Sequence, residues 1–320
     1  MSSFRKLFIN SFSCFGGTKS GRRAIRNILD ALILDRKREN DEVALQGVLL
    51  QKLNKELESF TIQYGDDFPK NVWQYWGQGK GTEPVIIKKC FDSVTKILEP
   101  CGFKIIRLDN ESICNYLDVE SLLGNIGSKK GFTYTAFSDL ARCGLLYQYG
   151  GIWLDASIFL SGIPNVLLSN NRVLFERDKN SSLREKILYM SRGHYFRWGH
   201  NVRVNWLSSV IKAPKEDPLF GLMWKVLRRY WEEENEYTNY FLAQILFDLI
   251  KNRSRILSNL NYIMCNDLSP HELQFMLHNM VDADKLNALL CDTTIHKLTY
   301  KLDDRICKDQ NNVFNYILKL

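Results

Sequence analysis

The stretch LYQYGGIWLDASIFL (Leu146–Leu160) joins an expected helix to an expected strand through two glycines. Apolar residues at helical spacing run up to these glycines, which are typical of the position just after a helix. The run that follows, GIWLDASIFL, has the texture of a buried strand and contains a single acid, Asp155. The function therefore depends on what a carboxylate does in an otherwise apolar strand.

Length and composition indicate a globular protein with ample apolar content for a core. The chain has 320 residues, of which 45% are hydrophobic and 25% are charged. No apolar run approaches the roughly 18 residues that a membrane-spanning helix needs. Arg5 and Lys6 precede an apolar stretch, but polar residues such as Asn10 interrupt it, so we expect no cleaved signal peptide. The expected location is cytoplasmic, either free or at the inner face of the cell membrane.

The cysteines indicate whether disulfides or a zinc site are present, and the net charge indicates the kind of partner. The eight cysteines form no CxxC pair and no compact framework, so scattered buried thiols are favoured over disulfides or a zinc site. The net charge of +7 favours anionic partners such as nucleotides, phospholipid headgroups or diphosphate-linked lipids. It does not single out nucleic acid, and we expect no nucleic-acid partner.

Residues 1–62 are expected to form a helical extension with a basic bias, ahead of one domain at 63–320. Six basic residues precede the first acid, Asp30, and apolar residues at helical spacing follow. Either these basic residues lie on a solvated helix face, or residues 1–40 contact an anionic membrane surface. We favour the solvated face because the apolar stripe is short. The six basic residues are Arg5, Lys6, Lys19, Arg22, Arg23 and Arg26.

From residue 68 onwards, strands and helices are expected to alternate. NVWQYWGQG (71–79) predicts a strand that ends in a glycine-rich turn, and FKIIRLD (103–109) predicts another strand. A helix is expected after Pro84, and a second within YTAFSDLARCGLLYQYGG (134–151). The N-cap candidates of the second helix are Thr135 and Ser138, and Gly150 or Gly151 follows its end. Beyond residue 200 the pattern is mostly helical. The alternation indicates an α/β fold with a mainly parallel twisted sheet and helical additions at both ends.

Two pairs of side chains near this helix and strand are candidates for chemistry. Alternate residues of a strand share a face, so Asp155 and Ser157 are expected on one side, about 6–7 Å apart. Ligands of α/β sheets bind beyond the carboxyl ends of the strands, where such oxygens suit a hard divalent cation that grips a diphosphate. Asp139 and Arg142 share a helix face. They form either a structural ion pair or a grip for the hydroxyls of a polar ligand.

The stretch FSDLARCGLLYQYGGIWLDASIF (137–159) resembles a signature of glycosyltransferases with the nucleotide-sugar-binding GT-A fold. That signature reads S-D-x-x-R, then L-Y-x-x-G-G-x-[WY]-x-D-x-[DST]. The chain is most similar to the capsular polysaccharide synthesis family, which is related to the initiating mannosyltransferases of fungi and to the large clostridial glucosylating toxins. NVWQYWGQGKGTEPVIIKKCFDS (71–93) and IHKLTYK (295–301) resemble further motifs of this family. The resemblance covers residues 68 to 301 in order.

The resemblance implies a role for each residue that matches a motif. The first-strand loop encloses the nucleotide base and ribose, the helix pair holds the hydroxyls of the donor sugar, and the closing motif meets the metal and the diphosphate. The implied catalytic residues are Asp139, Arg142 and Asp155; the implied donor-binding residues are Trp73, Gln74, Trp76, Ser138, Asp139, Arg142, Asp155 and Lys297; the implied metal ligands are Asp155, Ser157 and His296.

The sequence departs from the related families at two places. Asp155 matches the first acid of the Asp-x-Asp motif, but Ser157 stands where the mannosyltransferases have the second. The capsule branch is expected to carry Asp-Ala-Ser or Asp-Ala-Thr there, so the difference indicates the branch. A divalent cation, Mn²⁺ or Mg²⁺, is implied as cofactor. The pattern DYFLxH reads NYFLAQ here (Asn239–Gln244), and no role is transferred to its two altered ends.

The implied function is transfer of a hexosyl unit from a UDP- or GDP-linked sugar to a growing polysaccharide or lipid-linked oligosaccharide. The reaction is implied to be metal-assisted and to retain the anomeric configuration. Loops within 176–215 are expected to bind the acceptor. One alternative, motivated by Ser157, is a non-catalytic nucleotide-sugar-binding or scaffold subunit of a polysaccharide assembly. A second, an RNA-binding protein, lacks the clustered basic and aromatic motifs of that class.

Overall fold

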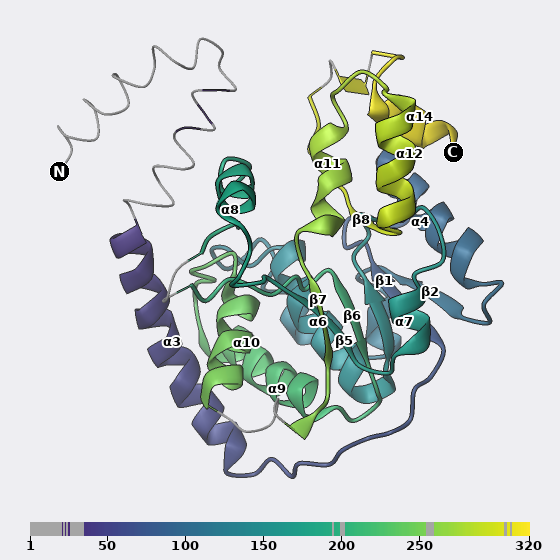
Figure 1. Ribbon diagram of the computed structural model, residues 1–320. Helices are drawn as coiled ribbons and strands as arrows, with labels where there is room; N and C mark the ends of the chain where they lie inside the picture. The colour runs from purple at the N-terminus through teal and green to yellow at the C-terminus, as the bar shows by residue number, and fades with distance from the viewer. Residues whose placement is uncertain are drawn as a thin grey trace.

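The computed structural model describes residues 21, 23, 25, 35–193, 195–198, 202–253, 259–303, 306–307 and 309–320. Within these residues, helices surround a six-stranded sheet with the strand order β2-β1-β3-β6-β5-β7 (Figure 1). A smaller sheet pairs β4 with β8. The strands are β1 (Asn71–Tyr75), β2 (Lys104–Leu108), β3 (Gly151–Leu154), β4 (Ile158–Leu160), β5 (Val173–Glu176), β6 (Val210–Ala213), β7 (Ile263–Asn266) and β8 (Ile295–Lys297).

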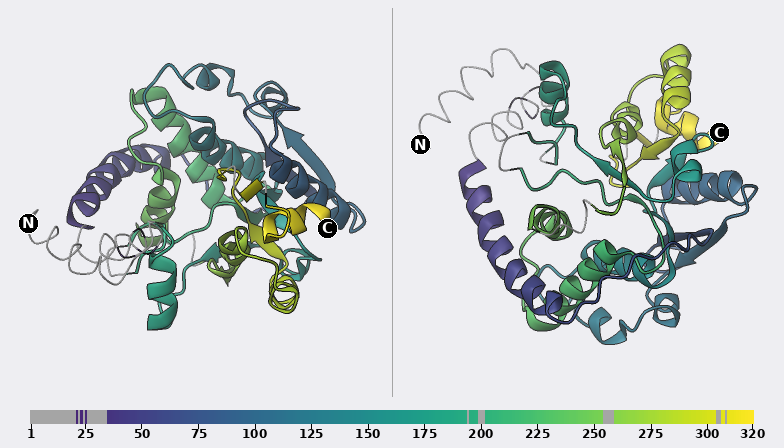
Figure 2. Two further views of the ribbon diagram at one scale, coloured as in Figure 1. Left: turned by 90° about the horizontal axis from the view of Figure 1, so that it is seen from above. Right: turned by 60° about the horizontal axis from the view of Figure 1, so that its bottom comes forward.

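Helices lie on both sides of the large sheet, and α3 and α14 lie at opposite sides of the molecule in every view (Figures 1 and 2). The described helices are α3 (Asp35–Leu57), α4 (Val85–Leu98), α5 (Glu120–Leu123), α6 (Tyr134–Tyr149), α7 (Asn165–Ser169), α8 (Leu183–Met190), α9 (Pro218–Glu233), α10 (Leu242–Arg253), α11 (Glu272–Met276), α12 (Ala283–Asp292) and α14 (Val313–Lys319), with 3₁₀ turns η1 (Ser112–Asn115) and η3 (Ser269–His271).

The large sheet is mainly parallel. β1 runs parallel to β2 and to β3, and β5 runs parallel to β7. β6 runs antiparallel to both of its neighbours, β3 and β5. The expected α/β fold with a mainly parallel sheet is therefore confirmed. The carboxyl ends of β1 and β3 lie side by side at one edge of the sheet, which is where α/β proteins bind ligands.

Alternation along the strands divides the core between the two faces of the sheet. Trp73 of β1 and Trp153 of β3 are buried in one cluster with residues of α6, α9 and α10. Val72 and Ile152 precede them in the same strands and are buried in a second cluster with residues of α4 and α7. Because helices cover both faces, every residue of β3 is buried.

Helices α6 and α9 pack closely because each has a glycine at the contact. A Cβ placed on Gly144 of α6 would lie 2.7 Å from the ring of Trp224 in α9. A Cβ on Gly221 of α9 would lie 2.7 Å from the ring of Tyr147 in α6. A larger side chain at either position would overlap a buried aromatic ring. This contact fixes the helix that carries the Asp-x-x-Arg pair.

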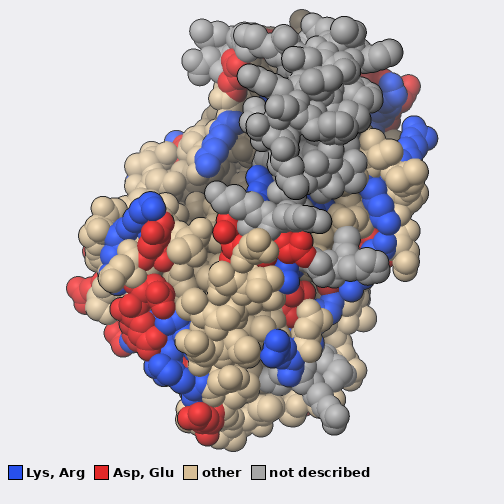
Figure 3. Space-filling model, turned by 90° about the vertical axis from the view of Figure 1, so that its left-hand side faces the viewer, with Lys and Arg blue, Asp and Glu red and all other residues tan. Residues whose placement is uncertain are grey.

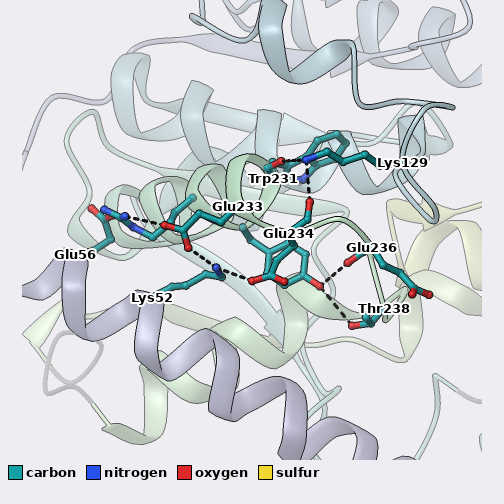
Figure 4. Close-up of polar contacts among 10 residues, drawn as sticks. Lys52, Glu56, Lys129, Trp231, Glu233, Glu234, Glu236 and Thr238 are labelled. Atoms are coloured by element: carbon teal, nitrogen blue, oxygen red, sulfur yellow. Dashed lines mark hydrogen bonds and ion pairs between the residues drawn. The ribbon is translucent and has the colours of Figure 1, made fainter.

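The extension helix α3 is attached to α9 by apolar and ionic contacts. Three leucines of α3 are buried in the cluster that contains α9 and α10. Lys52 Nζ lies 2.6 Å from a carboxylate oxygen of Glu233 and 2.8 Å from one of Glu234 (Figure 4). Arg229 lies 2.6 Å from Glu56 in the same group. On the side of the molecule shown in Figure 3, acidic and basic side chains are interspersed rather than gathered by sign.

The boundary at residue 62 and the membrane contact of residues 1–40 stay predictions. Of the N-terminal basic residues, Arg5, Lys6, Lys19, Arg22 and Arg26 lie outside the described residues. In the part of the chain that the structure describes, no helix is both long and apolar enough to cross a membrane.

The segment GIWLDASIFL forms two strands, so the expectation of one strand was wrong. The Asp155 amide donates to the Ser209 carbonyl at 2.9 Å, which continues the pairing of β3 with the segment before β6. The Asp155 carbonyl then accepts the amide of Ile158 at 2.9 Å and closes a turn. The chain leaves this turn as β4, which pairs with β8 in the smaller sheet. Asp155 therefore lies at the carboxyl end of β3, directly after the strand.

Two smaller expectations can also be compared with the structure. Helix α6 has Thr133 as its N-cap, whose hydroxyl accepts the amide of Ala136, so neither Thr135 nor Ser138 is the cap. Gly150 follows the helix with a φ of 61°, as the glycine signal predicts. The described cysteines are free thiols, but the expectation that they are buried holds only for Cys90 and Cys143. Cys101 and Cys265 are half-buried, Cys114, Cys291 and Cys307 are exposed, and Cys14 lies outside the described residues.

Candidate active site

A pocket of about 260 Å³ opens at the carboxyl ends of β1 and β3. Its walls come from the end of β1, the start of α6, the turn after β3 and the segment that begins with β8. Most of the side chains in these walls are polar or aromatic. The residues that line it are Tyr75, Trp76, Gly77, Gln78, Ile87, Tyr134, Thr135, Ser138, Trp153, Asp155, Ala156, Ser157, Tyr240, Gln274, Lys297, Leu298, Thr299, Tyr300 and Lys301.

Asp155 lies at the base of this pocket and accepts four hydrogen bonds. Its Oδ1 accepts from Trp153 Nε1 at 2.8 Å and from an Arg142 guanidinium nitrogen at 3.1 Å. Its Oδ2 accepts from Ser209 Oγ at 2.8 Å and from Lys297 Nζ at 2.7 Å. The side chain is 20% exposed. A carboxylate can follow the apolar strand β3 because two cationic and two neutral donors satisfy its oxygens.

The cations decide the charge state of Asp155. Burial by itself would raise the pKa of this carboxyl. The charges of Lys297 and Arg142, together with hydrogen bonds from Lys297 and Trp153, outweigh burial and hold the pKa well below its usual range. Asp155 is therefore a carboxylate throughout the physiological pH range.

Asp139 and Arg142 form an ion pair behind the pocket. One guanidinium nitrogen of Arg142 lies 2.7 Å from Asp139 Oδ1. The other terminal nitrogen donates to Ser138 Oγ at 3.0 Å. Both charged side chains are almost fully buried, and neither lines the pocket. Burial raises the pKa of Asp139 to about 6, although the charge of Arg142 opposes this shift. The pair is linked to the pocket by the contact between Arg142 and Asp155.

Lys297 comes to this site from the far end of the sequence. β8 pairs antiparallel with β4, and the register places Lys297 opposite Ile158, next to the turn that holds Asp155. Its Nζ donates to Asp155 Oδ2 and to Ser157 Oγ, at 2.7 Å each. The closing motif and the Asp-Ala-Ser turn are thus brought together, as the resemblance implies.

Of the three first-strand residues, only Trp76 lines the pocket. Its ring lies edge-on to Tyr300 at 5.3 Å, and its Nε1 donates to Thr82 Oγ1 at 3.0 Å. Trp73 is buried in the core, where its Nε1 donates to the Gly150 carbonyl at 2.8 Å. Gln74 is also fully buried, and its side-chain oxygen accepts from Arg107. The structure therefore gives Trp73 and Gln74 positions in the interior of the sheet.

His296 and Lys297 are neighbours in β8 and point to opposite faces, as strand geometry requires. His296 is fully buried, its Nε2 lies 2.9 Å from Ser161 Oγ, and its ring packs on Phe159. Burial lowers the pKa of His296 to about 4, so the imidazole is neutral at pH 7. His296 does not line the pocket.

The residues present do not fit a divalent cation. The resemblance implies the ligand set Asp155, Ser157 and His296, but His296 lies on the other face of β8. The Ser157 hydroxyl is occupied by Lys297, whose ammonium group also takes one oxygen of Asp155. Among the described residues, no group of three or more His, Cys, Asp or Glu side chains could hold a metal ion. The three implied ligands are therefore not assembled at one point.

Part of the expected acceptor segment has another role. Arg177 is buried, and its guanidinium lies 2.6 Å from Asp267 and over the ring of Tyr195, 4.4 Å from the centroid. The rings of Phe196 and Trp198 also pack against this guanidinium, each with its centroid 5.2 Å away. None of the described residues in 176–215 lines the pocket, and 194 and 199–201 lie outside the described part.

Sequence reasoning missed several residues of the site. Lys301 and Tyr300 line the pocket and belong to the quoted stretch IHKLTYK, so that motif held a signal for them. Tyr75, the last residue of β1, precedes Trp76 and also lines the pocket. Ser209 donates to Asp155 from 54 residues away, and no local pattern marks it. Trp153 matches the motif but was assigned no function.

The comparisons with known proteins agree with the sequence motifs. The family of capsular polysaccharide synthesis proteins matches residues 26–317, and this chain belongs to that family. The resemblance stated from the motifs is thereby confirmed. No curated protein is similar enough to the chain to count as a match.

Two solved structures resemble the chain distantly. One is the PaToxG glycosyltransferase, with 11% identity over 88% of this chain and 95% of that chain, and a TM-score of 0.37. The other is mouse xyloside xylosyltransferase 1 in its apo form, with 9% identity over 74% of this chain and 99% of that chain, and a TM-score of 0.34. Likenesses this weak add nothing to the argument from the family and the site.

Proposed function

We propose that this chain is a glycosyltransferase. In this proposal it moves a hexosyl unit from a UDP- or GDP-linked sugar to a growing polysaccharide or lipid-linked oligosaccharide. Membership in the capsular polysaccharide synthesis family supports the pathway. The observation that supports the chemistry is Asp155, held as a carboxylate between Arg142 and Lys297 at the base of a pocket beyond β3.

Three features of the pocket favour a ligand with a diphosphate. Lys297 and Lys301 both line it, and each ammonium group can pair with a phosphate oxygen. The first turns of α6 contribute Tyr134, Thr135 and Ser138 to the wall. The N-terminal end of a helix carries a partial positive charge that favours an anion. Trp76 supplies an aromatic surface for a nucleotide base at the same opening.

The main requirement of the proposed reaction is stabilisation of the diphosphate leaving group. The bond between the anomeric carbon and the diphosphate oxygen breaks, and its electron pair leaves with the diphosphate. A hydroxyl oxygen of the acceptor forms the new bond to that carbon and releases its proton to water. Lys297 and Lys301 stabilise the charge that develops on the diphosphate. The resemblance also implies retention, which the anomeric configuration of the product, read by NMR, would test.

In this arrangement Asp139 and Arg142 are positioning residues. Arg142 holds Oδ1 of Asp155 from behind the pocket, and Asp139 holds Arg142. The alternative role that the resemblance implies, a direct grip on the sugar hydroxyls, requires both side chains to reach the pocket. A ligand-bound structure would separate the two roles.

A screen of nucleotide sugars tests the proposed function. Wild-type protein is incubated with UDP-glucose, UDP-galactose, UDP-N-acetylglucosamine and GDP-mannose, and release of the nucleoside diphosphate is measured. Turnover of at least one donor supports the proposal. Tight binding of UDP or GDP without turnover of any donor or acceptor pair would instead favour a scaffold subunit. If the protein neither binds a nucleotide nor turns over a donor, both the glycosyltransferase and the scaffold proposals are contradicted.

A further inference from the structure

The ammonium group of Lys297 lies between the two oxygen-bearing residues of the Asp-Ala-Ser turn. Its Nζ is 2.7 Å from Asp155 Oδ2 and 2.7 Å from Ser157 Oγ. The pairing of β8 with β4 fixes the backbone of Lys297 beside this turn. Asp155 and Ser157 are also two of the three residues that the resemblance implies as ligands of a divalent cation. Here a side chain of the protein already supplies a positive charge there.

Asp155 has no oxygen site left for a metal. A carboxylate offers about four lone-pair sites on its two oxygens. Trp153 and Arg142 take those of Oδ1, and Ser209 and Lys297 take those of Oδ2. A metal would have to displace one of these donors, two of which are charged. Ser157 could not compensate, because a hydroxyl is a weaker ligand than a carboxylate and carries no charge to attract the ion.

The charges of the site balance without a metal. Asp139 and Asp155 contribute two negative charges, and Arg142 and Lys297 contribute two positive charges, all within one connected set of ion pairs. A lysine ammonium has three donor hydrogens. Two of them are used on Asp155 and Ser157, and Lys297 also lines the pocket. The third is therefore available to a phosphate oxygen in the pocket.

We propose that Lys297 takes the place of the divalent cation, so that this protein binds and uses its donor without a metal. This inference rests on the proposed function and names the cation of that same site. Serine at position 157 then follows from the chemistry, because its hydroxyl accepts from the ammonium group without adding a second negative charge. A second carboxylate there would compete with the diphosphate for Lys297.

Metal removal tests the inference on the wild-type protein. Release of nucleoside diphosphate is measured with the best donor of the screen, once in excess EDTA and once with added Mn²⁺. Binding of UDP and GDP is measured by calorimetry under the same two conditions. The expected result is a turnover rate and an affinity that each change by less than about twofold, because a fixed side chain supplies the charge.

Substitution of Lys297 tests the same claim from the side of the protein. Lys297→Met is expected to lower turnover by about 100-fold or more and to weaken binding of UDP or GDP, as loss of a charged donor at a leaving group does. Lys319→Met, at the exposed end of α14, is the matched control and is expected to keep wild-type turnover. The melting temperature of each variant shows whether it is folded, and the wild-type comparison in EDTA needs no variant.

The outcomes separate this inference from the proposed function. Turnover that falls tenfold or more in EDTA and returns with Mn²⁺ would overturn the inference and leave the proposed function standing. Full turnover in folded Lys297→Met would also overturn it. No turnover and no nucleotide binding, with or without metal, would contradict the proposed function and the inference together.

Discussion

Lys297 Nζ lies 2.7 Å from Asp155 Oδ2, although 142 residues separate the two in the chain. The contact depends on the antiparallel pairing of β4 with β8, which brings the closing segment back to the turn after β3. It joins the stretches 137–159 and 295–301, which carry the family motifs, into one site. Asp155 in turn links Lys297 to the buried pair Arg142 and Asp139. Of these four charged side chains, Asp155 and Lys297 line the pocket, and Arg142 and Asp139 are buried behind it.

Asp139 predicts a pH dependence of stability. Its pKa is raised to about 6, above the model-peptide value of 3.8, so the folded protein keeps this proton to a higher pH than the unfolded chain does. The contribution of Asp139 to the free energy of unfolding is therefore fully present below pH 4 and falls as the pH rises to about 6. Asp139→Asn removes this titration. Urea unfolding at several pH values measures the difference between wild type and variant.

The prediction for Asp139 is tested by how the difference in unfolding free energy between the two proteins changes with pH. The free energy of unfolding of the wild type, minus that of Asp139→Asn, should decrease between pH 4 and pH 6 and level off above it. Groups remote from Asp139 titrate in both proteins and cancel in the subtraction. A difference that increases with pH over this range would show that Asp139 is stabilised as a carboxylate, contrary to the burial seen here.

Much of the fold and the centre of the site could be predicted from the sequence. The alternation of strand and helix patterns predicted the mainly parallel sheet, because periodicity is a local property. The Asp-x-x-Arg helix and the acid after two glycines marked Arg142 and Asp155. The closing motif also marked Lys297, which lines the same pocket as Asp155. Each of these signals lies within a short stretch of chain.

The features that the sequence did not predict depend on distant partners. The break after Asp155 carries no glycine or proline, and it follows from the pairing of β4 with β8. The same pairing decides that His296 faces the core, because a three-residue strand does not reveal which face is which. Ser209 reaches Asp155 across 54 residues. Such contacts are set by tertiary packing and leave no local pattern.

Gly144 tests the close packing of α6 on α9. Gly144→Ala should lower the free energy of unfolding by about 1–3 kcal/mol, because the added methyl group overlaps the ring of Trp224. Gly47→Ala in α3 is the control, since no atom lies within 4 Å of its added Cβ. That change should raise stability by about 0.5–1 kcal/mol through the higher helix propensity of alanine. Equal effects of the two substitutions in chemical denaturation would contradict this packing.

Lys52 tests the attachment of α3 to the domain. Lys52→Met should lower the free energy of unfolding by about 1–2 kcal/mol, because a buried lysine loses its ion pairs with Glu233 and Glu234 (Figure 4). The exposed neighbour Lys55 is the matched control, and Lys55→Met should change stability by less than about 0.5 kcal/mol. Thermal and urea unfolding measure both. If the two variants are equally stable, α3 is not held by this group.

Trp76 tests the side of the pocket assigned to the nucleotide base. Trp76→Ala should weaken binding of UDP or GDP by about tenfold, because stacking of a base on an aromatic ring contributes about 1–3 kcal/mol. The variant should remain folded, since Trp76 lies at the pocket rather than in the core. Trp73→Ala should instead destabilise the protein by about 3–5 kcal/mol, as loss of a buried tryptophan does. Calorimetry and melting temperatures distinguish a binding defect from an unfolding defect.

The most direct test of the central claim is donor turnover by Asp155→Asn beside the wild type, with circular dichroism to confirm that both are folded. Asparagine keeps the shape of the side chain and removes the charge that Arg142 and Lys297 share. We expect the wild type to turn over a nucleotide sugar and the variant to lose about 1,000-fold or more of that turnover. Wild-type turnover in folded Asp155→Asn would contradict this expectation.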